Sequence, residues 1–352
     1  MRPAHLLAGL VGATVVLAAC TSPAAPSASP TAAAPAASSA SEAPASATPR
    51  PAVTLKFGTS SPRSFPDAPT LAAFDALRAE QNIDVEFISF QSGDDTIRAL
   101  VARQVDIAVV FPSGIMAAAR EGNIKLWFNS KEDEWSLACR SDITSPSELT
   151  GKKVGRHSPN DLTAALLGNT IAKYSVEPEL ITIPGSENRV IALLQGQIDC
   201  SPIDIAGLFV LEAERPGGFK PILRYADDLP GLIVTQHTVA NTDSMAADPE
   251  TWKILATYLA KYHRQAVEDA AYLASIADKY FPGEDSELHK KTAQAYVDYK
   301  AFTRDGGLSK ERMDKLIQFY VDAGSLKATD VLPFDQYATT EFVDAAIEAL
   351  GP

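Results

Sequence analysis

Serine side chains recur in the short polar segments that separate predicted strands from predicted helices. The positions are Ser60, Ser61, Ser92, Ser113, Ser158 and Ser201. A hydroxyl can donate or accept a hydrogen bond, and the start of a helix adds unpaired backbone N–H groups and a partial positive charge. Such segments can hold a polar or anionic ligand without a basic side chain. Any one of these serines could instead be a helix cap, the commoner role of serine at a helix start.

Aromatic, amide and charged side chains lie in or beside the same segments. They are Phe65, Phe111, Trp135, Gln91, Asp94, Asp161, Asp204 and Arg63. The aromatic rings could supply flat apolar contact with a ligand, and the polar groups could bond to its edge. The alternatives are core packing for the rings, capping for the aspartates and a solvated loop charge for the arginine.

A repeated segment predicts the elements that place these residues. Ile97-Arg-Ala-Leu-Val-Ala-Arg-Gln-Val-Asp-Ile and Val190-Ile-Ala-Leu-Leu-Gln-Gly-Gln-Ile-Asp-Cys lie 93 residues apart and share Ala-Leu-x-x-x-Gln-[Val/Ile]-Asp. In each copy the apolar spacing predicts a helix, and the run after Gln predicts a short buried strand. A strand and a polar loop precede both copies, which makes two βαβ units. Two units predict two α/β lobes with a ligand between them, because open parallel sheets bind ligands outside the carboxyl ends of their strands. The repeated Asp106 and Asp199 are interpreted as structural.

The order of predicted elements sets the lobe boundaries. Strands are predicted at 53–57, 83–90, 106–111, 124–128, 153–156, 180–183, 222–225 and 232–235. A capping box at Ser145 and Glu148 predicts a helix start. Further helices are expected near 249–280, 285–302, 309–323 and 339–350. Because this helical tail has no sheet of its own, we expect residues 51–134 and 237–352 to form lobe 1 and residues 135–236 to form lobe 2.

The N-terminus predicts an export signal that takes no part in the fold. An apolar run ends in Leu17-Ala-Ala-Cys20, which resembles the bacterial lipobox. The resemblance implies a lipoprotein signal peptide at 1–19 and lipid on Cys20, which would anchor the protein to a membrane outside the cytoplasm. An ordinary signal peptide cleaved nearby is the alternative. Residues 20–50 are rich in Ala, Ser, Pro and Thr, a composition that predicts a disordered tether.

Export permits disulfides, and two cysteines remain besides Cys20. Cys139 lies in a strand-like run, and Cys200 is taken to end the strand of the second repeat. Their positions in the sequence do not determine whether they meet. Two buried free thiols are the favoured interpretation, with a disulfide as the alternative.

Charge and motif content exclude several function classes. The formal net charge is -13 at pH 7 and no dense basic stripe occurs, so no nucleic-acid partner is expected. The sequence contains no Gly-x-Ser-x-Gly, Walker-type loop, His-Glu-x-x-His or Cys-x-x-Cys motif. With 5 histidines in all, no metal site is expected, and the isolated His157 is interpreted as polar packing.

Together these features resemble the solute-binding proteins of ABC importers, in the branch of sulfonate, taurine, nitrate and thiamine-precursor (NMT1/THI5-like) binding proteins. The resemblance rests on the lipobox at Cys20, both Ala-Leu-x-x-x-Gln-[Val/Ile]-Asp repeats and Leu149-Thr-Gly-Lys-Lys-Val-Gly, and it covers nearly all of 53–350. The sequence departs from the family pattern at Arg103, where a glycine usually precedes Gln-Val-Asp. It also has no Gly-Phe-Phe run after the first helix.

The resemblance implies a two-lobed periplasmic-binding-protein fold of type II. In this fold each lobe is a mostly parallel sheet flanked by helices, and here the helical tail would pack on the first lobe. It also implies a cleft that closes on a small molecule, ABC permease subunits as partners, a monomeric state, no cofactor and no catalysis. A pyrimidine synthase of thiamine biosynthesis shares the fold, but its cysteine-rich motif is not seen here. A sensory receptor would need a transmembrane helix and an output domain, and neither is recognised in the sequence.

The favoured ligand is an aromatic heterocycle, such as a thiamine precursor, a pyrimidine or a flavin-like molecule. Aspartates outnumber the single base Arg63 in the cleft loops, which disfavours a small hard anion. A ring edge with N–H donors would satisfy those acids, while the aromatic side chains stack on the ring. The runner-up is a sulfonate or similar organic anion held on helix N-termini, with Asp161 and Asp204 turned away as caps.

Overall fold

A five-stranded sheet with strand order β2-β1-β3-β10-β4 combines four strands from the first part of the chain with the later strand β10. Its strands are β1 (Val53–Thr59), β2 (Ile83–Ser89), β3 (Ile107–Val109), β4 (Ile124–Glu132) and β10 (Val234–Asn241). β10 runs antiparallel to both neighbours, and the other four strands share one direction. The structure is a computed structural model that describes residues 50–351, so Cys20, the signal peptide and nearly all of the predicted tether lie outside the described residues.

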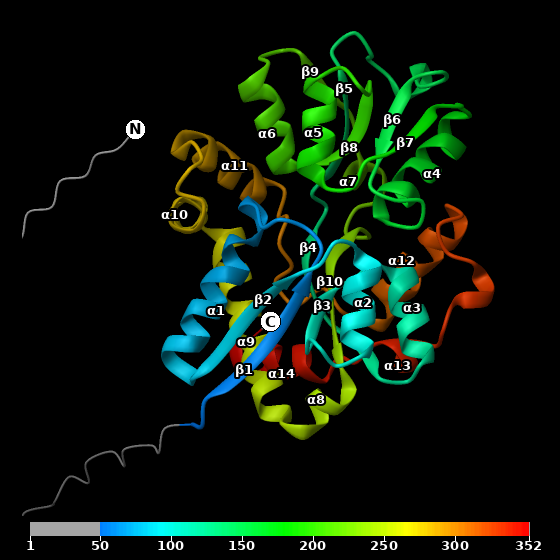
Figure 1. The fold of residues 1–352 in the computed structure, drawn as a ribbon. Helices are drawn as coiled ribbons and strands as arrows, with labels where there is room; N and C mark the ends of the chain where they lie inside the picture. Colours follow the sequence, from blue (N-terminus) through cyan, green and yellow to red (C-terminus); the bar gives the residue numbers. More distant parts are fainter. Residues whose placement is uncertain (1–49, 352) are drawn as a thin grey trace, which may run out of the picture. The chain divides into compact units, whose positions relative to one another are not determined.

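A second five-stranded sheet has the order β7-β6-β8-β5-β9. Its strands are β5 (Trp135–Arg140), β6 (Lys153–Arg156), β7 (Glu179–Thr182), β8 (Cys200–Asp204) and β9 (Phe219–Arg224). β5 is antiparallel to both neighbours, while β6 runs parallel to β7 and β8. The two sheets therefore share one layout, in which a single reversed strand occupies the fourth position (Figure 1).

Helices flank both sheets (Figure 1). They are α1 (Ala68–Gln81), α2 (Gly93–Val101), α3 (Pro112–Arg120), α4 (Leu162–Tyr174), α5 (Ser186–Leu194), α6 (Ile205–Glu214), α7 (Tyr225–Asp228), α8 (Thr242–Ala247), α9 (Pro249–Glu268), α10 (Ala270–Tyr280), α11 (Ser286–Asp298), α12 (Lys310–Asp322), α13 (Phe334–Tyr337) and α14 (Glu341–Leu350). Short 3-10 turns occupy Phe65–Asp67, Pro146–Glu148 and Ala328–Asp330.

The C-terminal helices cover the first sheet, as expected. α9 packs on α1 and β4, and α14 packs on α9. At this contact the rings of Trp127 and Trp252 meet edge to face with centroids 5.3 Å apart, and Phe342 packs on both. The tail also contacts helices of the second sheet, since α11 touches α6 and α12 touches α4. A Cβ added at Gly168 of α4 would lie 2.6 Å from the carbonyl oxygen of Ala323, so this close helix contact requires glycine.

The repeated segments form the equivalent pairs α2–β3 and α5–β8. Asp106 accepts a hydrogen bond from the backbone N–H of Lys56, and Asp199 accepts one from Lys153, each at 2.8 Å. Both aspartates therefore tie the start of one strand to its neighbour, in agreement with a structural role. The turn before each strand needs a left-handed residue, which is Gly196 with φ 68° in one copy and Arg103 with φ 58° in the other.

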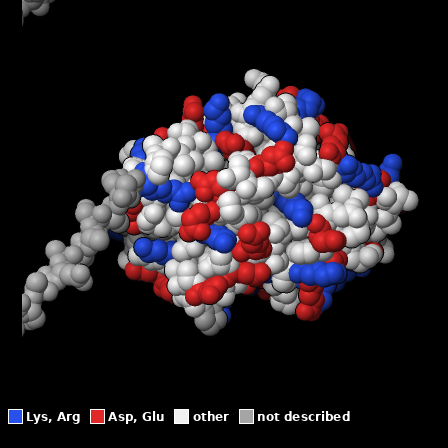
Figure 2. Space-filling model, turned by 90° about the horizontal axis from the view of Figure 1, so that it is seen from below, with Lys and Arg blue, Asp and Glu red and all other residues white. Residues whose placement is uncertain are grey.

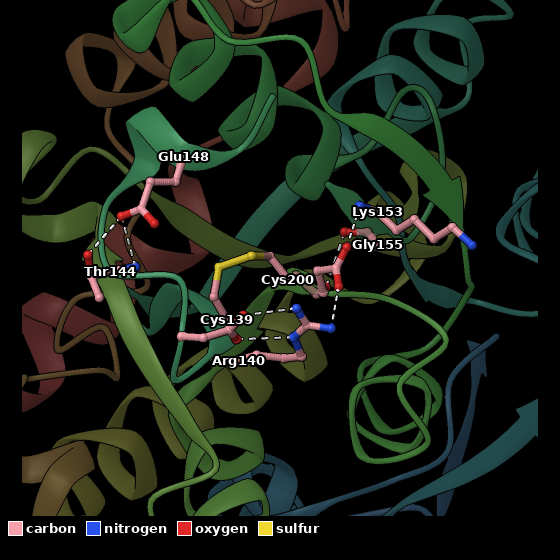
Figure 3. Close-up of a disulfide and its surroundings, with 10 residues drawn as sticks. Cys139, Arg140, Thr144, Glu148, Lys153, Gly155 and Cys200 are labelled. Atoms are coloured by element: carbon pink, nitrogen blue, oxygen red, sulfur yellow. Dashed lines mark hydrogen bonds and ion pairs between the residues drawn. A yellow bond between two sulfur atoms is a disulfide. The ribbon is translucent and has the colours of Figure 1, made fainter. Parts of the chain in front are cut away.

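Cys139 and Cys200 form a disulfide (Figure 3), which corrects the favoured interpretation of two free thiols. The two residues lie directly opposite each other on the antiparallel strands β5 and β8, with Cα atoms 4.0 Å apart. Cys200 begins β8 rather than ending a strand, as the sequence had suggested. The register of β5 and β8 therefore determines that Cys139 is the partner of Cys200. The residues next to each cysteine in the sequence do not reveal this register.

Two predicted helices were wrong in extent. The expected helix start at Ser145 is a single 3-10 turn, because the Ser145 hydroxyl accepts from Ser147 N and Glu148 bonds to Thr144 instead of completing a capping box. The helix expected at 249–280 is divided at Asp269, whose side chain caps α10.

The described residues form one compact unit. Among residues 50–351, no helix is both long and apolar enough to cross a membrane. Figure 2 shows one face of the molecule, on which acidic and basic side chains are interspersed and no continuous basic area is seen.

Candidate functional site

A cavity of about 230 Å³ is lined by residues from both sheets. The first sheet contributes the loop after β1, the ends of β3 and β4, and part of β10. The second contributes the loop before α4, the first turn of α5 and Asp204 at the end of β8. The cavity thus lies beyond the carboxyl ends of strands in both sheets, where open α/β sheets bind ligands.

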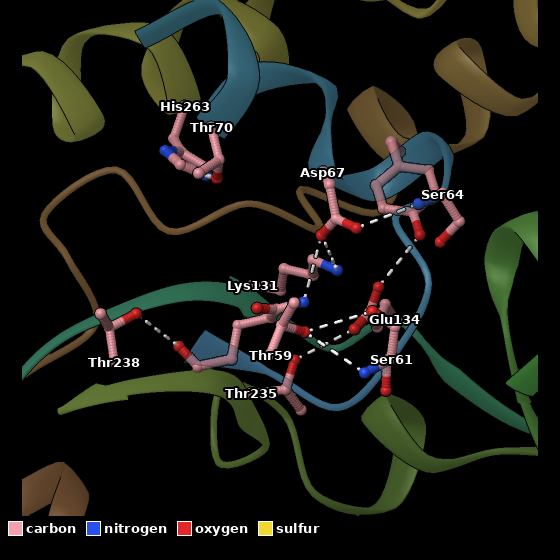
Figure 4. Close-up of polar contacts among 12 residues, drawn as sticks. Thr59, Ser61, Ser64, Asp67, Thr70, Lys131, Glu134, Thr235, Thr238 and His263 are labelled. Carbon is pink, nitrogen blue, oxygen red and sulfur yellow. Dashed lines mark hydrogen bonds and ion pairs between the residues drawn. The ribbon is translucent and has the colours of Figure 1, made fainter. Parts of the chain in front are cut away.

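A buried lysine organises the wall formed by the first sheet (Figure 4). The Lys131 side chain is 7% exposed, and its Nζ lies 3.5 Å from an Asp67 carboxylate oxygen. Gln236 donates to the same oxygen at 3.2 Å, and Ser64 N donates to the other at 3.0 Å. Burial lowers the pKa of Lys131, but the carboxylates of Asp67, Glu134 and Asp204 together raise it above its ordinary value. The lysine is therefore charged at neutral pH.

Glu134 is a buried acid at the link between the two sheets. Its carboxylate accepts from the hydroxyls of Thr235 and Tyr296, each at 3.0 Å. Burial raises the pKa of Glu134 to about 7. The positive charge of Lys131 lowers this pKa, and the negative charge of Asp204 raises it further. Both protonation states are thus accessible near neutral pH.

One residue of the same wall has a strained backbone. Gln236 has φ 56° inside β10, a left-handed conformation that costs about 1–2 kcal/mol for a residue other than glycine. Its side chain is held by Asp67. Strained residues of this kind gather at functional sites, where the surrounding structure holds them in place.

The opposite wall carries a buried arginine. Arg189 in the first turn of α5 is 1% exposed, and its Nη1 donates to the carbonyls of Ile183 and Gly185 at 3.3 and 2.9 Å. None of the ion pairs found within residues 50–351 includes Arg189. Burial lowers the pKa of its guanidinium, opposed by Asp161, Asp204 and Glu187.

His157 lies beside this arginine and is held neutral. Its Nδ1 accepts from Gly185 N at 3.0 Å, so the neutral ring carries its proton on Nε2. Burial lowers the pKa of His157, opposed by Asp161 and reinforced by Arg189. Phe111 of the first half meets the imidazole edge to face at 6.1 Å.

Half of the residues singled out from the sequence line the cavity. These are Ser60, Ser61, Arg63, Phe111, Trp135, Asp161 and Asp204. Arg63 lies over the ring of Phe87, 4.8 Å from its centroid. Asp161 caps α4 and Asp204 caps α6, by accepting from Ala164 N and Gly207 N.

The other half lies outside the cavity, for local reasons. Phe65 packs in the core against Tyr296, and Ser201 is fully buried and donates to Gly155 O. Ser113 donates to Asn160 O at 3.3 Å, a contact between the two halves. Gln91 lies on a separate groove. Ser92 caps α2, Asp94 lies in the first turn of α2, and Ser158 belongs to the turn before α4.

Sequence reasoning missed four polar residues of the cavity wall, Lys131, Glu134, Arg189 and Gln236. Lys131 and Glu134 belong to a charged run that is typical of a solvated turn. Arg189 did leave a signal. It occupies the position of Thr96 in the other repeat, which is fully buried, so a charge stood on the inward face of a predicted amphipathic helix.

The chain belongs to the NMT1/THI5-like family, whose sequence profile matches residues 79–269, more than half of its length. No curated protein matches the sequence significantly.

Solved structures confirm the two-lobed periplasmic-binding-protein fold. A ligand-binding component of an ABC-type import system from Staphylococcus aureus, with zinc bound, superposes with TM-score 0.68 at 13% identity, covering 84% of this chain and 99% of that one. The alkanesulfonate-binding protein from Xanthomonas axonopodis pv. citri, bound to MOPS, gives 0.64 at 14% identity, covering 82% and 99%. The periplasmic nitrate-binding protein from Synechocystis gives 0.67 at 14% identity, covering 86% and 90%. Within residues 50–351 of the present chain, no cluster of three or more His, Cys, Asp or Glu side chains suits a metal ion.

Proposed function

We propose that this protein is the extracytoplasmic solute-binding component of an ABC uptake transporter, anchored through lipid on Cys20 and delivering a small organic molecule to permease subunits. The cavity carries the proposal, because buried charges from both sheets surround it. Family membership and the ABC-import, sulfonate-binding and nitrate-binding neighbours support it. The proposal assigns no reaction to the cavity and treats residues 51–134 with 237–352, and residues 135–236, as the two lobes.

The shape of the cavity favours a ligand with a single ring. Its volume of about 230 Å³ lies below the range of about 300–1,000 Å³ typical of drug-sized ligands. Phe111, Trp135 and Phe87 present aromatic surface to it. Among the expected heterocycles, a pyrimidine or a thiamine precursor therefore fits better than a flavin.

A thermal-shift screen tests solute capture directly. The compounds are pyrimidines, thiamine-related compounds, flavins, aliphatic and aromatic sulfonates, and nitrate. A compound at 100 times its Kd should stabilise the protein by about 2.7 kcal/mol and raise its Tm.

Two matched variants test whether the ligand binds in the cavity. Ser61→Trp puts a large side chain on an exposed position of the cavity wall and should abolish the shift, while Ser147→Trp, exposed and away from the cavity, should keep it. If no compound in the panel moved the Tm, or if both variants kept the shift, the proposal would be refuted.

A further inference from the structure

We infer that the ligand carries an acidic oxygen group, a carboxylate or a sulfonate, bound through the free edge of the Arg189 guanidinium with help from Trp135 and Ser186. The inference rests on the proposed solute-binding function and defines the chemistry of the captured molecule. The sequence favours a heterocycle whose edge carries N–H donors. The present inference replaces that ligand with a ring that carries an acidic group.

Unpaired donors on the cavity wall are the first observation. Three buried side-chain atoms there have no hydrogen-bond partner among the described residues, and they are Arg189 Nε, Trp135 Nε1 and Ser186 Oγ. The guanidinium and indole nitrogens can only donate, and the hydroxyl can donate as well. Because an unpaired buried donor is costly, the missing partner of this group is an acceptor.

Four of the five carboxylates on the cavity wall, all but Glu187, already accept hydrogen bonds. Asp161 accepts from Ala164 N, Ser158 N and the Thr163 hydroxyl. The other three have their own donors, since Asp67 binds Lys131, Gln236 and Ser64 N, Glu134 binds Thr235 and Tyr296, and Asp204 binds Gly207 N. A ligand with N–H donors would find these oxygens engaged, whereas a ligand with acceptor oxygens meets three free donors.

The orientation of Arg189 specifies an anion. Its Nη1 is committed to two backbone carbonyls, which leaves the parallel Nε–H and Nη2–H edge. That edge can bind carboxylate or sulfonate oxygens in a bidentate manner, and the guanidinium, only 1% exposed, makes no direct ion pair within residues 50–351.

The neighbouring donors are placed to act on the same group. Ser186 lies three residues before Arg189 on α5, on the same helix face, and the start of α5 contributes a partial positive charge. Trp135 pairs directly with Asp204 across β5 and β8, and its side chain lines the same cavity as Arg189. Trp135 can therefore offer its ring to stacking and its Nε1–H to the acid.

Isothermal titration with matched ligand pairs tests the inference. The probes are pyrimidine-5-carboxylate against pyrimidine-5-carboxamide, and benzenesulfonate against benzenesulfonamide. Each pair keeps the ring and replaces one anionic oxygen by a neutral NH2 group, which removes the charge and one acceptor. The wild type should bind at least one acid about 100-fold more tightly than its amide, the range expected for hydrogen bonds to a charged group.

Three variants assign the effect to the cavity wall. Arg189→Gln should weaken binding of the acid about 100-fold and change that of the amide less than about threefold. Trp135→Phe keeps the ring, is the safer variant for folding, and should weaken the acid about tenfold. Arg156→Gln is the control, because Arg156 also has a buried unpartnered Nε but lies outside the cavity, and it should leave both affinities unchanged.

The outcomes separate this inference from the proposed function. Binding of an amide as tightly as its acid, or equal losses for both in Arg189→Gln and Trp135→Phe, would overturn the acidic ligand and leave solute capture standing. If neither member of either pair bound and the metabolite panel also gave no shift, both conclusions would fall.

Discussion

Reduction of the Cys139–Cys200 disulfide should lower the free energy of unfolding by about 4 kcal/mol. The bond closes a loop with a sequence separation of 61 residues, and the chain-entropy relation for a loop of that length gives about 4 kcal/mol at 25 °C. It joins β5 to β8, two inner strands of the second sheet, and both cysteines are fully buried. The loss should therefore appear in the unfolding of that sheet.

Urea unfolding of the oxidised and the fully reduced protein measures the difference. Cys20 is replaced by serine in both samples so that only this pair can react. Reduction keeps both sulfur atoms in the core and isolates the cross-link from any cavity. The double variant Cys139→Ala/Cys200→Ala should lose more, because it also removes buried atoms.

A difference below about 1 kcal/mol between the oxidised and reduced proteins would refute this reasoning. Such a result would mean that residual structure already restricts the reduced unfolded chain, or that the bond does not form. A thiol count under denaturing conditions distinguishes these two explanations.

Two further predictions concern pH and a turn. Burial lowers the pKa values of His237 and His263 to about 4, so the unfolded chain takes up protons first and acidification from about pH 6.5 toward pH 4 should cost about 3 kcal/mol per histidine. Glu134, with its raised pKa of about 7, contributes stability that is fully present below about pH 4.5 and is lost as the pH rises to 7. In Glu134→Gln the free energy of unfolding should therefore fall more steeply on acidification than in the wild type, as measured by urea unfolding at pH 4.5, 5.5 and 7. An unchanged dependence of this free energy on pH would contradict the prediction. Gly196→Ala should cost about 1 kcal/mol, because φ is 68° and no neighbour lies within 4 Å of the added Cβ. Arg103→Gly should change the free energy of unfolding by less than about 0.5 kcal/mol. Glycine relieves the left-handed backbone, but it also makes the unfolded chain more flexible and removes the surface ion pair with Asp243. Equal Tm changes for Gly196→Ala and Arg103→Gly would contradict the left-handed requirement of this turn.

Local pattern was sufficient to predict most of the strands and the repeated units. Alternation in residues 53–57 and the paired Gln-[Val/Ile]-Asp turns depend on neighbours in the chain, and the structure places β1 and β3 accordingly, whereas β8 begins at Cys200, where the predicted strand ended. The positions of Asp161 and Asp204 at the carboxyl ends of strands follow from the same reasoning, because a helix that starts directly after a strand begins at that end of the sheet.

The polar interior of the cavity could not be predicted in the same way. Lys131 and Glu134 look solvated in the sequence, and only the packing of α11 and β10 around them removes the water. The disulfide depends on the register between β5 and β8, which are separated by most of the second half. Arg189 could have been found, because a repeat comparison sets it against the buried Thr96.

The place of β10 in the chain has a consequence for the order of folding. β10 lies between β3 and β4 in the first sheet, yet it follows every strand of the second sheet in the sequence. The second sheet is built from the uninterrupted segment 135–224, so it can form as soon as that segment has emerged. Until residue 234 and its successors are available, β3 and β4 each expose an unpaired edge, and unpaired edges invite pairing with other chains. The second sheet can therefore be completed before the first, whose β3 and β4 edges stay open until the chain returns to them.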